Sequence, residues 1–365
     1  MTIPFLLLVA VITASGQANI WTDIPASSLA AKKPGDLPPA AFRPLSLNHS
    51  SLEGFLSAVP LEAATAVNQS SKIILLPMPD GSMQQFRVVE SPVMEKALAD
   101  KFPLIKTYLG KGIDDPAATV RFDWTPLGFH ALIIKPEGFV FIEPYNRDNA
   151  HQYISYYQKD LPVPADLKLC TMESGADLQK SGREILPNLP SGAQLRTYRL
   201  AVAATGEYTA QYGGNVATAL AAITTVVNQI TLIYEVEVAI RFVLIGNNNL
   251  IIYTNAGTDP YSDVVNNPCS TPVRSENQTA IDGAIGAANY DIGHVFTGTN
   301  IGGCAAGSVV CGGSKAWGAS GVRLGGAFDI GLASHEMGHQ FSAAHTFNSN
   351  IGSCLGGQYS AATAY

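Results

Sequence analysis

The sequence lacks features that would assign it to several common protein classes. It has no cluster of Lys and Arg and a formal net charge of −7, so a nucleic acid is not an expected partner. Its 5 cysteines include no C-x-x-C pair, which argues against a structural zinc site built from thiolates. No stretch after the N-terminal residues is expected to span a membrane, because the apolar run at residues 230–245 is interrupted by Glu235, Glu237 and Arg241.

The N-terminal residues have the pattern of a signal peptide. An apolar run at residues 4–14 is too short for a bilayer, and Gly16 and Ala18 occupy positions −3 and −1 of a cut before Asn19. We therefore expect residues 1–18 to be removed and the protein to be secreted. A buried first strand is the alternative. The length of 365 residues and an apolar content of 47% favour about two domains with packed cores.

Residues 19–160 are predicted to form a β-rich domain. Two strands, at residues 73–76 and 85–89, flank a Pro-Asp-Gly turn and predict a hairpin. A short helix is expected from Ser91, with Pro92 in its first turn. Three further runs alternate apolar and polar residues between tight turns and predict an antiparallel meander: residues 120–124, 130–134 and 139–143.

Residues 161–194 are rich in Pro and Gly and show no lasting period, which indicates a linker. Lys180 and Arg183 lie in it, where proteolytic cleavage concentrates. A domain, a cleavable linker and a further domain would be the organisation of a zymogen. A plain tether between two domains is the alternative.

The third region, residues 195–365, alternates strands with helices and predicts an α/β domain with a mostly parallel sheet. Asp329 is expected to cap a helix that begins near Ile330. His294 lies in an apolar strand and is expected to be a core histidine. The predicted helices cover residues 213–234 and 278–288, and the predicted strands cover residues 197–203, 238–245, 250–253, 292–297, 308–311 and 315–319.

One stretch of this region carries a chemical motif. His335, Glu336 and His339 form H-E-x-x-H, which places two imidazoles on one helical face with a carboxylate beside the first. His345 follows at a spacing that cannot share that face, so the helix must end near Ser342 and the chain must turn back. Three neutral imidazoles with an open fourth position are typical of a catalytic zinc site.

Other motifs of this kind use a downstream carboxylate as the third ligand. Residues 346–365 contain no Asp or Glu, so His345 is the one downstream candidate within the sequence. H-E-x-x-H alone also occurs by chance in helices, and the third His at this spacing favours the metal.

On these residues, the third region resembles the reprolysin-like (adamalysin-like) metzincin zinc metalloproteases, of the kind found in large secreted bacterial precursors. The resemblance rests on HEMGHQFSAAHTFN, YRLAVAATGEYT and ANYDIGHVFTG, and covers about residues 195–365. It implies one catalytic Zn²⁺ held by His335, His339 and His345, with Glu336 as the general base. It also implies that residues before 195 are an inhibitory propeptide.

The resemblance has two further implications and two departures. A strand at Ser308, Val309 and Val310 would line the cleft and pair with an extended peptide substrate. Ser342 replaces the Gly of the family motif, so the turn is either strained or of another geometry. The last methionine is Met337, so the Met-turn of the family is absent, and we expect the chain to be truncated before it.

The cysteines leave several pairings open. Cys269, Cys304, Cys311 and Cys354 allow three pairings, of which Cys304 with Cys311 closes the shortest loop. Cys170 lies in the predicted linker, and its thiolate could occupy the open zinc position as a cysteine switch. A disulfide or a buried thiol are the alternatives for Cys170. Acidic residues such as Asp259 and Asp263 make Ca²⁺ a weaker expectation, because their spacing fits no known calcium loop.

The sequence therefore predicts a secreted zinc-dependent endopeptidase made as a zymogen, which hydrolyses protein or peptide substrates with a zinc-activated water and Glu336 as the base. Two other classes stay open. One is a zinc-binding but catalytically inactive module used in adhesion or inhibition. The other is a secreted α/β domain without a metal.

Overall fold

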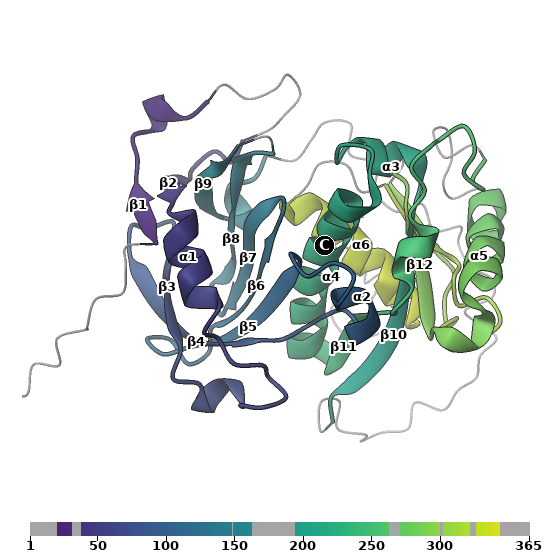
Figure 1. The fold of residues 1–365 in the computed structure, drawn as a ribbon, viewed down its shortest axis with the longest axis horizontal. Coiled ribbons are helices and arrows are strands. Elements are labelled where there is room, and N and C mark those ends of the chain that lie inside the picture. The colour runs from purple at the N-terminus through teal and green to yellow at the C-terminus, as the bar shows by residue number, and fades with distance from the viewer. Residues whose placement is uncertain are drawn as a thin grey trace, which may run out of the picture.

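The computed structural model describes residues 20–30, 38–147, 149–162, 194–262, 271–299, 302–321 and 326–343. They form two β-sheets with one long helix between them (Figure 1). The predicted signal peptide and nearly all of the predicted linker lie outside these residues, so both stay predictions.

The first sheet has nine strands and is antiparallel throughout, in the order β1-β2-β9-β8-β7-β6-β5-β4-β3. The predicted hairpin is confirmed as β3–β4, and the predicted meander as β6–β8. Helix α1 (His49–Leu56) covers one face and is capped by Asn48, whose side chain accepts from the Ser51 amide. The strands are β1 (Trp21–Asp23), β2 (Arg43–Leu47), β3 (Ile73–Pro77), β4 (Met83–Glu90), β5 (Lys106–Gly112), β6 (Thr119–Thr125), β7 (Gly128–Lys135), β8 (Gly138–Asn146) and β9 (Asn149–Tyr157).

The second sheet has five strands in the order β11-β10-β12-β14-β13. Its pairings are parallel except for β13, which runs antiparallel to β14 at the end of the sheet, so the sheet is mixed. The strands are β10 (Arg196–Ala204), β11 (Ile240–Leu244), β12 (Ile292–Phe296), β13 (Gly303–Ala305) and β14 (Gly318–Ser320). The helices are α3 (Gly206–Ala210), α4 (Val216–Val238), α5 (Thr271–Ile285) and α6 (Gly326–Gln340), with α5 on the outer side of this sheet (Figure 1).

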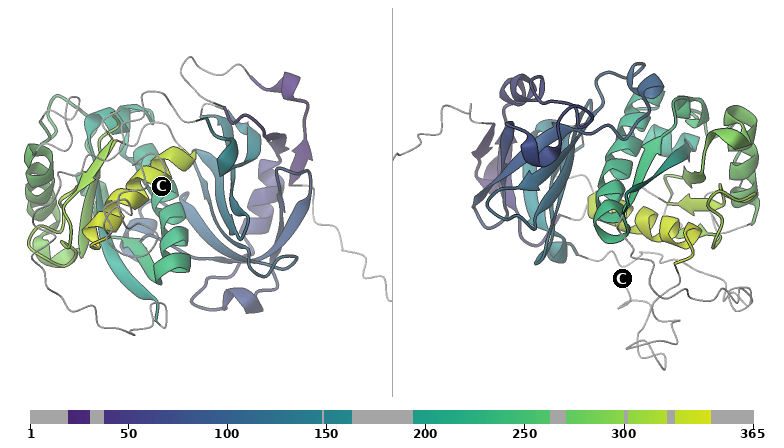
Figure 2. Two further views of the ribbon diagram at one scale, coloured as in Figure 1. Left: turned by 180° about the vertical axis from the view of Figure 1, so that it is seen from behind. Right: turned by 90° about the horizontal axis from the view of Figure 1, so that it is seen from below.

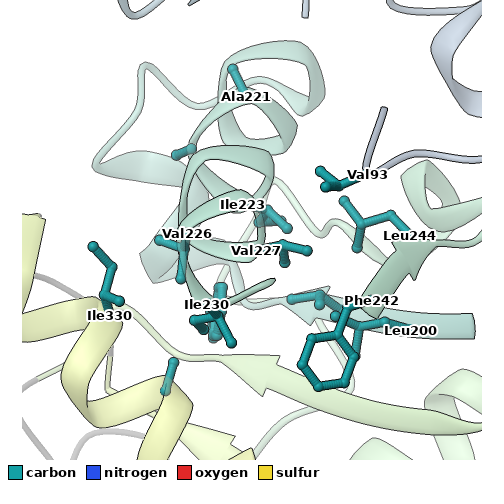
Figure 3. Close-up of a cluster of buried hydrophobic side chains, with 14 of the residues drawn as sticks. Val93, Leu200, Ala221, Ile223, Val226, Val227, Ile230, Phe242, Leu244 and Ile330 are labelled. Carbon is teal, nitrogen blue, oxygen red and sulfur yellow. The ribbon is translucent and has the colours of Figure 1, made fainter. Parts of the chain in front are cut away.

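Helix α4 lies between the two sheets (Figures 1 and 2). Asn215 caps its first turn, and Ala239 ends it in the left-handed conformation, with φ of 53°. The helix is long and apolar enough to cross a membrane by length and composition, but most of it is buried inside the protein. Its side chains belong to a core with members from both sheets. Figure 3 shows part of this core, with Val227 and Ile230 of α4 beside Phe242 of β11.

Two predicted elements are wrong for reasons of tertiary pairing. Residues 91–95 are not helical, because Met94 forms a bridge with Leu244 of β11, and helix α2 (Lys96–Ala99) begins only after them. Residues 250–253 were predicted as a strand, but Asn248–Ile251 is a 3₁₀ turn. The other 3₁₀ turns are Ala26–Ser28, Val67–Gln69, Gln158–Asp160 and Ala287–Asn289.

Candidate metal centre

Helix α6 presents two imidazoles to the same point in space. The Nε2 atoms of His335 and His339 are 3.0 Å apart, and their rings meet edge to face. Two ligands at about 2.0–2.1 Å from a tetrahedral zinc would have nitrogens roughly 3.3 Å apart. The spacing of the two imidazoles therefore fits a pair of ligands to one ion.

The tautomer of His339 is set by the end of its own helix. Its Nδ1 lies 2.7 Å from the carbonyl oxygen of Ala343, and because a carbonyl only accepts, Nδ1–H is the donor. The lone pair of the neutral ring is then on Nε2, the atom that faces His335. Burial lowers the pKa of His339, while the hydrogen bond to Ala343 acts in the opposite direction. The ring is thus kept neutral, as a metal ligand must be.

A Schellman turn closes α6 and brings Ala343 back to His339. The Ser342 amide donates to the His339 carbonyl at 2.8 Å, and the Ala343 amide donates to the Gly338 carbonyl at 2.9 Å. Ser342 has φ of 79°, the left-handed conformation that Gly adopts without cost, and its Oγ is 2.6 Å from Ser308 Oγ. The structure thus answers the question about the turn: Ser342 takes the strained backbone. His345 lies outside the described residues.

Glu336 is fully buried on the side of α6 that faces β13. A Cβ atom at Gly303 would lie 2.4 Å from the Glu336 Cγ, so only Gly leaves room for this side chain. Burial raises the pKa of Tyr234, and the charge of Glu336 adds to the rise. The Tyr234 hydroxyl donates to the Ser334 carbonyl at 2.8 Å and so ties α4 to the turn of α6 that carries His335 and Glu336.

A buried polar network fixes α6 on the five-stranded sheet. Gln340 donates from Nε2 to the carbonyls of Gly293, at 2.9 Å, and Lys315, at 3.2 Å, and accepts at Oε1 from His294 Nδ1, 3.0 Å away. The Ser320 hydroxyl lies 2.9 Å from His294 Nε2, and burial lowers the pKa of His294 to about 4. His294 is therefore the satisfied core histidine that was predicted. Gln340 was missed, and its signal was an amide directly after His339 on a buried helix.

The predicted cleft strand at residues 308–311 is wrong. Ser308, Val309 and Val310 lie in turns, and Ser308 and Cys311 both have φ of 61°. The Val309 amide donates to the Gln340 carbonyl at 3.1 Å, so the segment packs on the end of α6 instead of pairing with a strand. Within the described part of the chain, the antiparallel strand that ends this sheet is β13.

The described residues support neither the predicted pairing of Cys304 with Cys311 nor a calcium site at Asp259. Cys304 is buried in β13 and Cys311 is exposed, and the two are not joined to each other, because Cys311 sits in a turn that faces solvent. Asp259 accepts from the amides of Gly206, at 2.8 Å, and Tyr261, at 3.1 Å, so its oxygens organise loops and give calcium no support. The positions outside the described residues are Cys170, Asp263, Cys269 and Cys354.

The described residues contain no group of three His, Cys, Asp or Glu that could hold a metal. They contain two of the three predicted ligands, and the third, His345, lies just beyond them. Residues 194–364 match the family model of the reprolysin-like metallo-peptidases of family M12B. No curated protein matches the chain. The matched family is one of metallopeptidases, whose substrates are proteins or peptides.

Proposed function

Starting from the reprolysin-like metallopeptidase region at residues 194–364, we propose that the protein is a secreted zinc-dependent endopeptidase made as a zymogen. The observation that carries the proposal is the approach of the His335 and His339 Nε2 atoms to 3.0 Å, with the buried Glu336 beside them. A hydrolase needs a base at this position, and a buried carboxylate next to two converging imidazoles can supply it.

The residues that would hold zinc are His335, His339 and His345. The hydrogen bond from His339 Nδ1 to the Ala343 carbonyl orients the ring of His339 and leaves its Nε2 for the metal. When bound, zinc supplies a Lewis acid that polarises the scissile carbonyl and makes water more acidic. Calcium is not part of the proposal.

Glu336 is the proposed general base. Its carboxylate takes a proton from the attacking water and passes it to the nitrogen of the leaving amine. Gly303 leaves room for the side chain, because a Cβ atom there would collide with it. Glu336 is fully buried, and an environment with little water strengthens the electrostatic interactions of a carboxylate.

An extended peptide is the proposed form of the substrate. β13 ends its sheet among the described residues and runs beside the catalytic helix, so a substrate could add to it as a further strand. This assignment replaces Ser308, Val309 and Val310, which are held in turns.

The test of the proposed function is hydrolysis by the full-length protein. The protein would be expressed in full, its metal content measured, and a peptide library digested and mapped by mass spectrometry. We expect about one zinc per chain, internal cuts in peptides, and loss of both on treatment with a zinc chelator, with recovery on adding zinc. Zinc without any cleavage would support the inactive module instead, and no zinc would reject both.

The zymogen part of the proposal has its own test at Cys170. Cys170→Ser in the full precursor, assayed before the linker is cut, should release activity if the thiolate blocks the zinc. Lys180→Ser serves as the matched control, because it changes the same linker without touching the thiol. A Cys170→Ser precursor as silent as the unaltered one would reject the switch.

A further inference from the structure

The N-terminal sheet and the metallopeptidase region share one hydrophobic core. Buried side chains from the first sheet, such as Leu132, Phe141 and Ile154, belong to the same cluster as Leu220, Ile230 and others of α4. Helix α4 contributes apolar side chains to this cluster, and Figure 3 shows Val93 of the N-terminal region in the same group as Phe242 and Leu244. Taking the first sheet away would expose one whole side of α4 to water.

A chain of charged side chains crosses the same junction. Arg121 of β6 has no exposed side-chain surface and donates to both carboxylate oxygens of Glu235 in α4, at 3.0 and 2.8 Å. Glu235 also accepts from Arg241 of β11, and Arg241 donates to both oxygens of Glu62, at 2.9 and 3.0 Å. The outer members, Arg121 and Glu62, are N-terminal and the inner two are in the metallopeptidase region. Separating the two regions would leave charged side chains in each region without their ion-pair partners.

The main chains of the two regions are also bonded. The Leu244 amide donates to the Val93 carbonyl, and the Glu95 amide donates to the Leu244 carbonyl, both at 2.8 Å. The Glu95 carboxylate accepts from the Gly246 amide at 2.7 Å. Since β11 is the outer strand of its sheet, residues 93–95 cover an edge that would otherwise be open to other chains.

The last contact is at the first turn of the catalytic helix. A Cβ at Gly326 would lie 2.7 Å from a carboxylate oxygen of Glu143 and 3.1 Å from the hydroxyl of Tyr156, which itself donates to Glu143 at 2.9 Å. The positive end of the helix dipole stabilises a carboxylate at this position. At ~1.5 Å per residue, this contact is roughly 13 Å along α6 from His335, so it holds the helix at the end remote from the imidazoles.

We propose that residues 20–162 are a permanent, non-covalent subunit of the peptidase and not a segment that leaves on maturation. A cut between the regions should leave both bound, with the first sheet still burying α4 and holding the start of α6. Any silencing of the precursor would then belong to the linker around Cys170 and not to the sheet. The association itself does not depend on the proposed activity, so the two can fail separately.

The experiment cuts the chain at one chosen place and asks whether the halves separate. A recognition site for a specific protease would replace residues 180–183 in the full-length protein, and the cut product would be run on size exclusion at 1 M salt. We expect both fragments to elute together at the mass of the uncut chain. At about 1 µM, less than about a tenth should be dissociated, which corresponds to a Kd of roughly 10 nM or below. Separation of the fragments, whether soluble or precipitated, would overturn the proposal.

A matched pair of variants tests the junction itself. Glu235→Gln removes the charge between Arg121 and Arg241 and should weaken the association of the cut fragments at least about tenfold. Glu237→Gln, two residues further along α4 and exposed, should leave the association unchanged. Equal affinities for the two variants would contradict the assigned interface. Hydrogen exchange of residues 327–330 should be as slow in the cut protein as in the uncut one, and faster exchange would contradict the hold on α6.

Discussion

The two sheets differ in what their buried polar residues do. In the nine-stranded sheet, Arg121 and Asp123 of β6 point across the junction and meet Glu235 and Thr225 of α4. In the five-stranded sheet, the buried polar groups gather beneath α6. The first set joins one region to the other, whereas the second surrounds one turn of one helix.

The difference is also one of charge. The junction uses fully charged side chains. Removing such a charge from water costs free energy, and leaving it without its partner costs more. Ion pairs of this kind therefore favour one arrangement of the two regions over others. Beneath α6 the network is neutral: burial lowers the pKa of His294 to about 4, and Gln340 supplies amide hydrogen bonds. The side chains of this network are therefore neutral, and the charged base of the proposed mechanism is Glu336 of the same helix.

The largest expected effect breaks the junction. Arg121→Met leaves Glu235 buried beside one arginine fewer and should lower the free energy of unfolding by about 3–5 kcal/mol. Chemical denaturation of the full-length protein measures it. Lys96→Met removes an exposed ion pair with Asp100 and should cost less than about 1 kcal/mol. Equal losses for the two would show that the buried charges carry no special role.

The next prediction separates chemistry from support. Glu336→Ala should lower kcat/KM at least about a hundredfold, because the proposed base is removed, while the zinc content stays the same. Glu53→Ala, an exposed glutamate in α1, is the control and should change neither. Peptide cleavage by Glu336→Ala at the unaltered rate would remove the assigned mechanism.

The neutral network predicts a dependence of stability on pH. Burial lowers the pKa of His294 from 6.5 to about 4. Between those values the unfolded chain binds a proton that the folded chain does not, so stability falls as pH falls through this window, by up to roughly 3 kcal/mol. His294→Gln cannot take up the proton and should lose that slope, whereas exposed His151→Gln should keep it. The free energy of unfolding at pH 7, 5.5 and 4.5 tests both, and identical slopes would contradict the role of His294.

A smaller effect is expected from adding a methyl group at a glycine on either side of α6, because one side is closely packed and the other is open. Gly303→Ala would force Glu336 aside and should lower kcat/KM roughly tenfold. Gly331→Ala on the exposed side of α6 meets nothing within 4 Å and should stabilise the helix by up to about 1 kcal/mol with activity unchanged. An unaltered kcat/KM for Gly303→Ala would mean that Glu336 moves without consequence.

The smallest effect concerns the end of α6. Ser342→Gly relieves a left-handed residue but loses the contact with Ser308 Oγ, so the free energy of unfolding should change by less than about 1 kcal/mol. Ser342→Ala keeps the strained backbone and loses the same contact, so it should be the less stable of the two. If Ser342→Ala proved the more stable, strain at this position would not be the controlling factor.

The sequence predicts local elements of this protein well. Alternation and turn residues marked β3–β4 and β6–β8, and the helical spacing from Val216 marked α4, because in each case neighbours in sequence are also neighbours in space. The spacing of His335 and His339 likewise placed both imidazoles on one helical face. These are properties of a single element and need no knowledge of the rest.

What the sequence did not predict depends on distant partners. Residues 93–95 are not helical because β11 offers them an edge, and nothing near Ser91 indicates that edge. Val309 is held in a turn by the end of α6, although its apolar neighbours favour a strand. Gln340 is an ordinary polar residue until His294 is placed beneath it. The sequence did not predict the ion pairs of the junction, because their residues lie far apart in the chain.

Helix α4 has a consequence for the order in which the chain can fold. A segment this apolar would associate with other chains if it emerged from the ribosome with nothing to cover it. The nine-stranded sheet precedes α4 in synthesis, and most of its pairings join strands that are neighbours in the sequence, although β2 pairs with the distant β9. The strands that cover one face of α4 are therefore all synthesised before α4, whereas β12 and α6, its partners on the other face, are synthesised after it. A circular permutant that begins at residue 194 would reverse this order and would have to make its most adhesive helix before the surface that receives it.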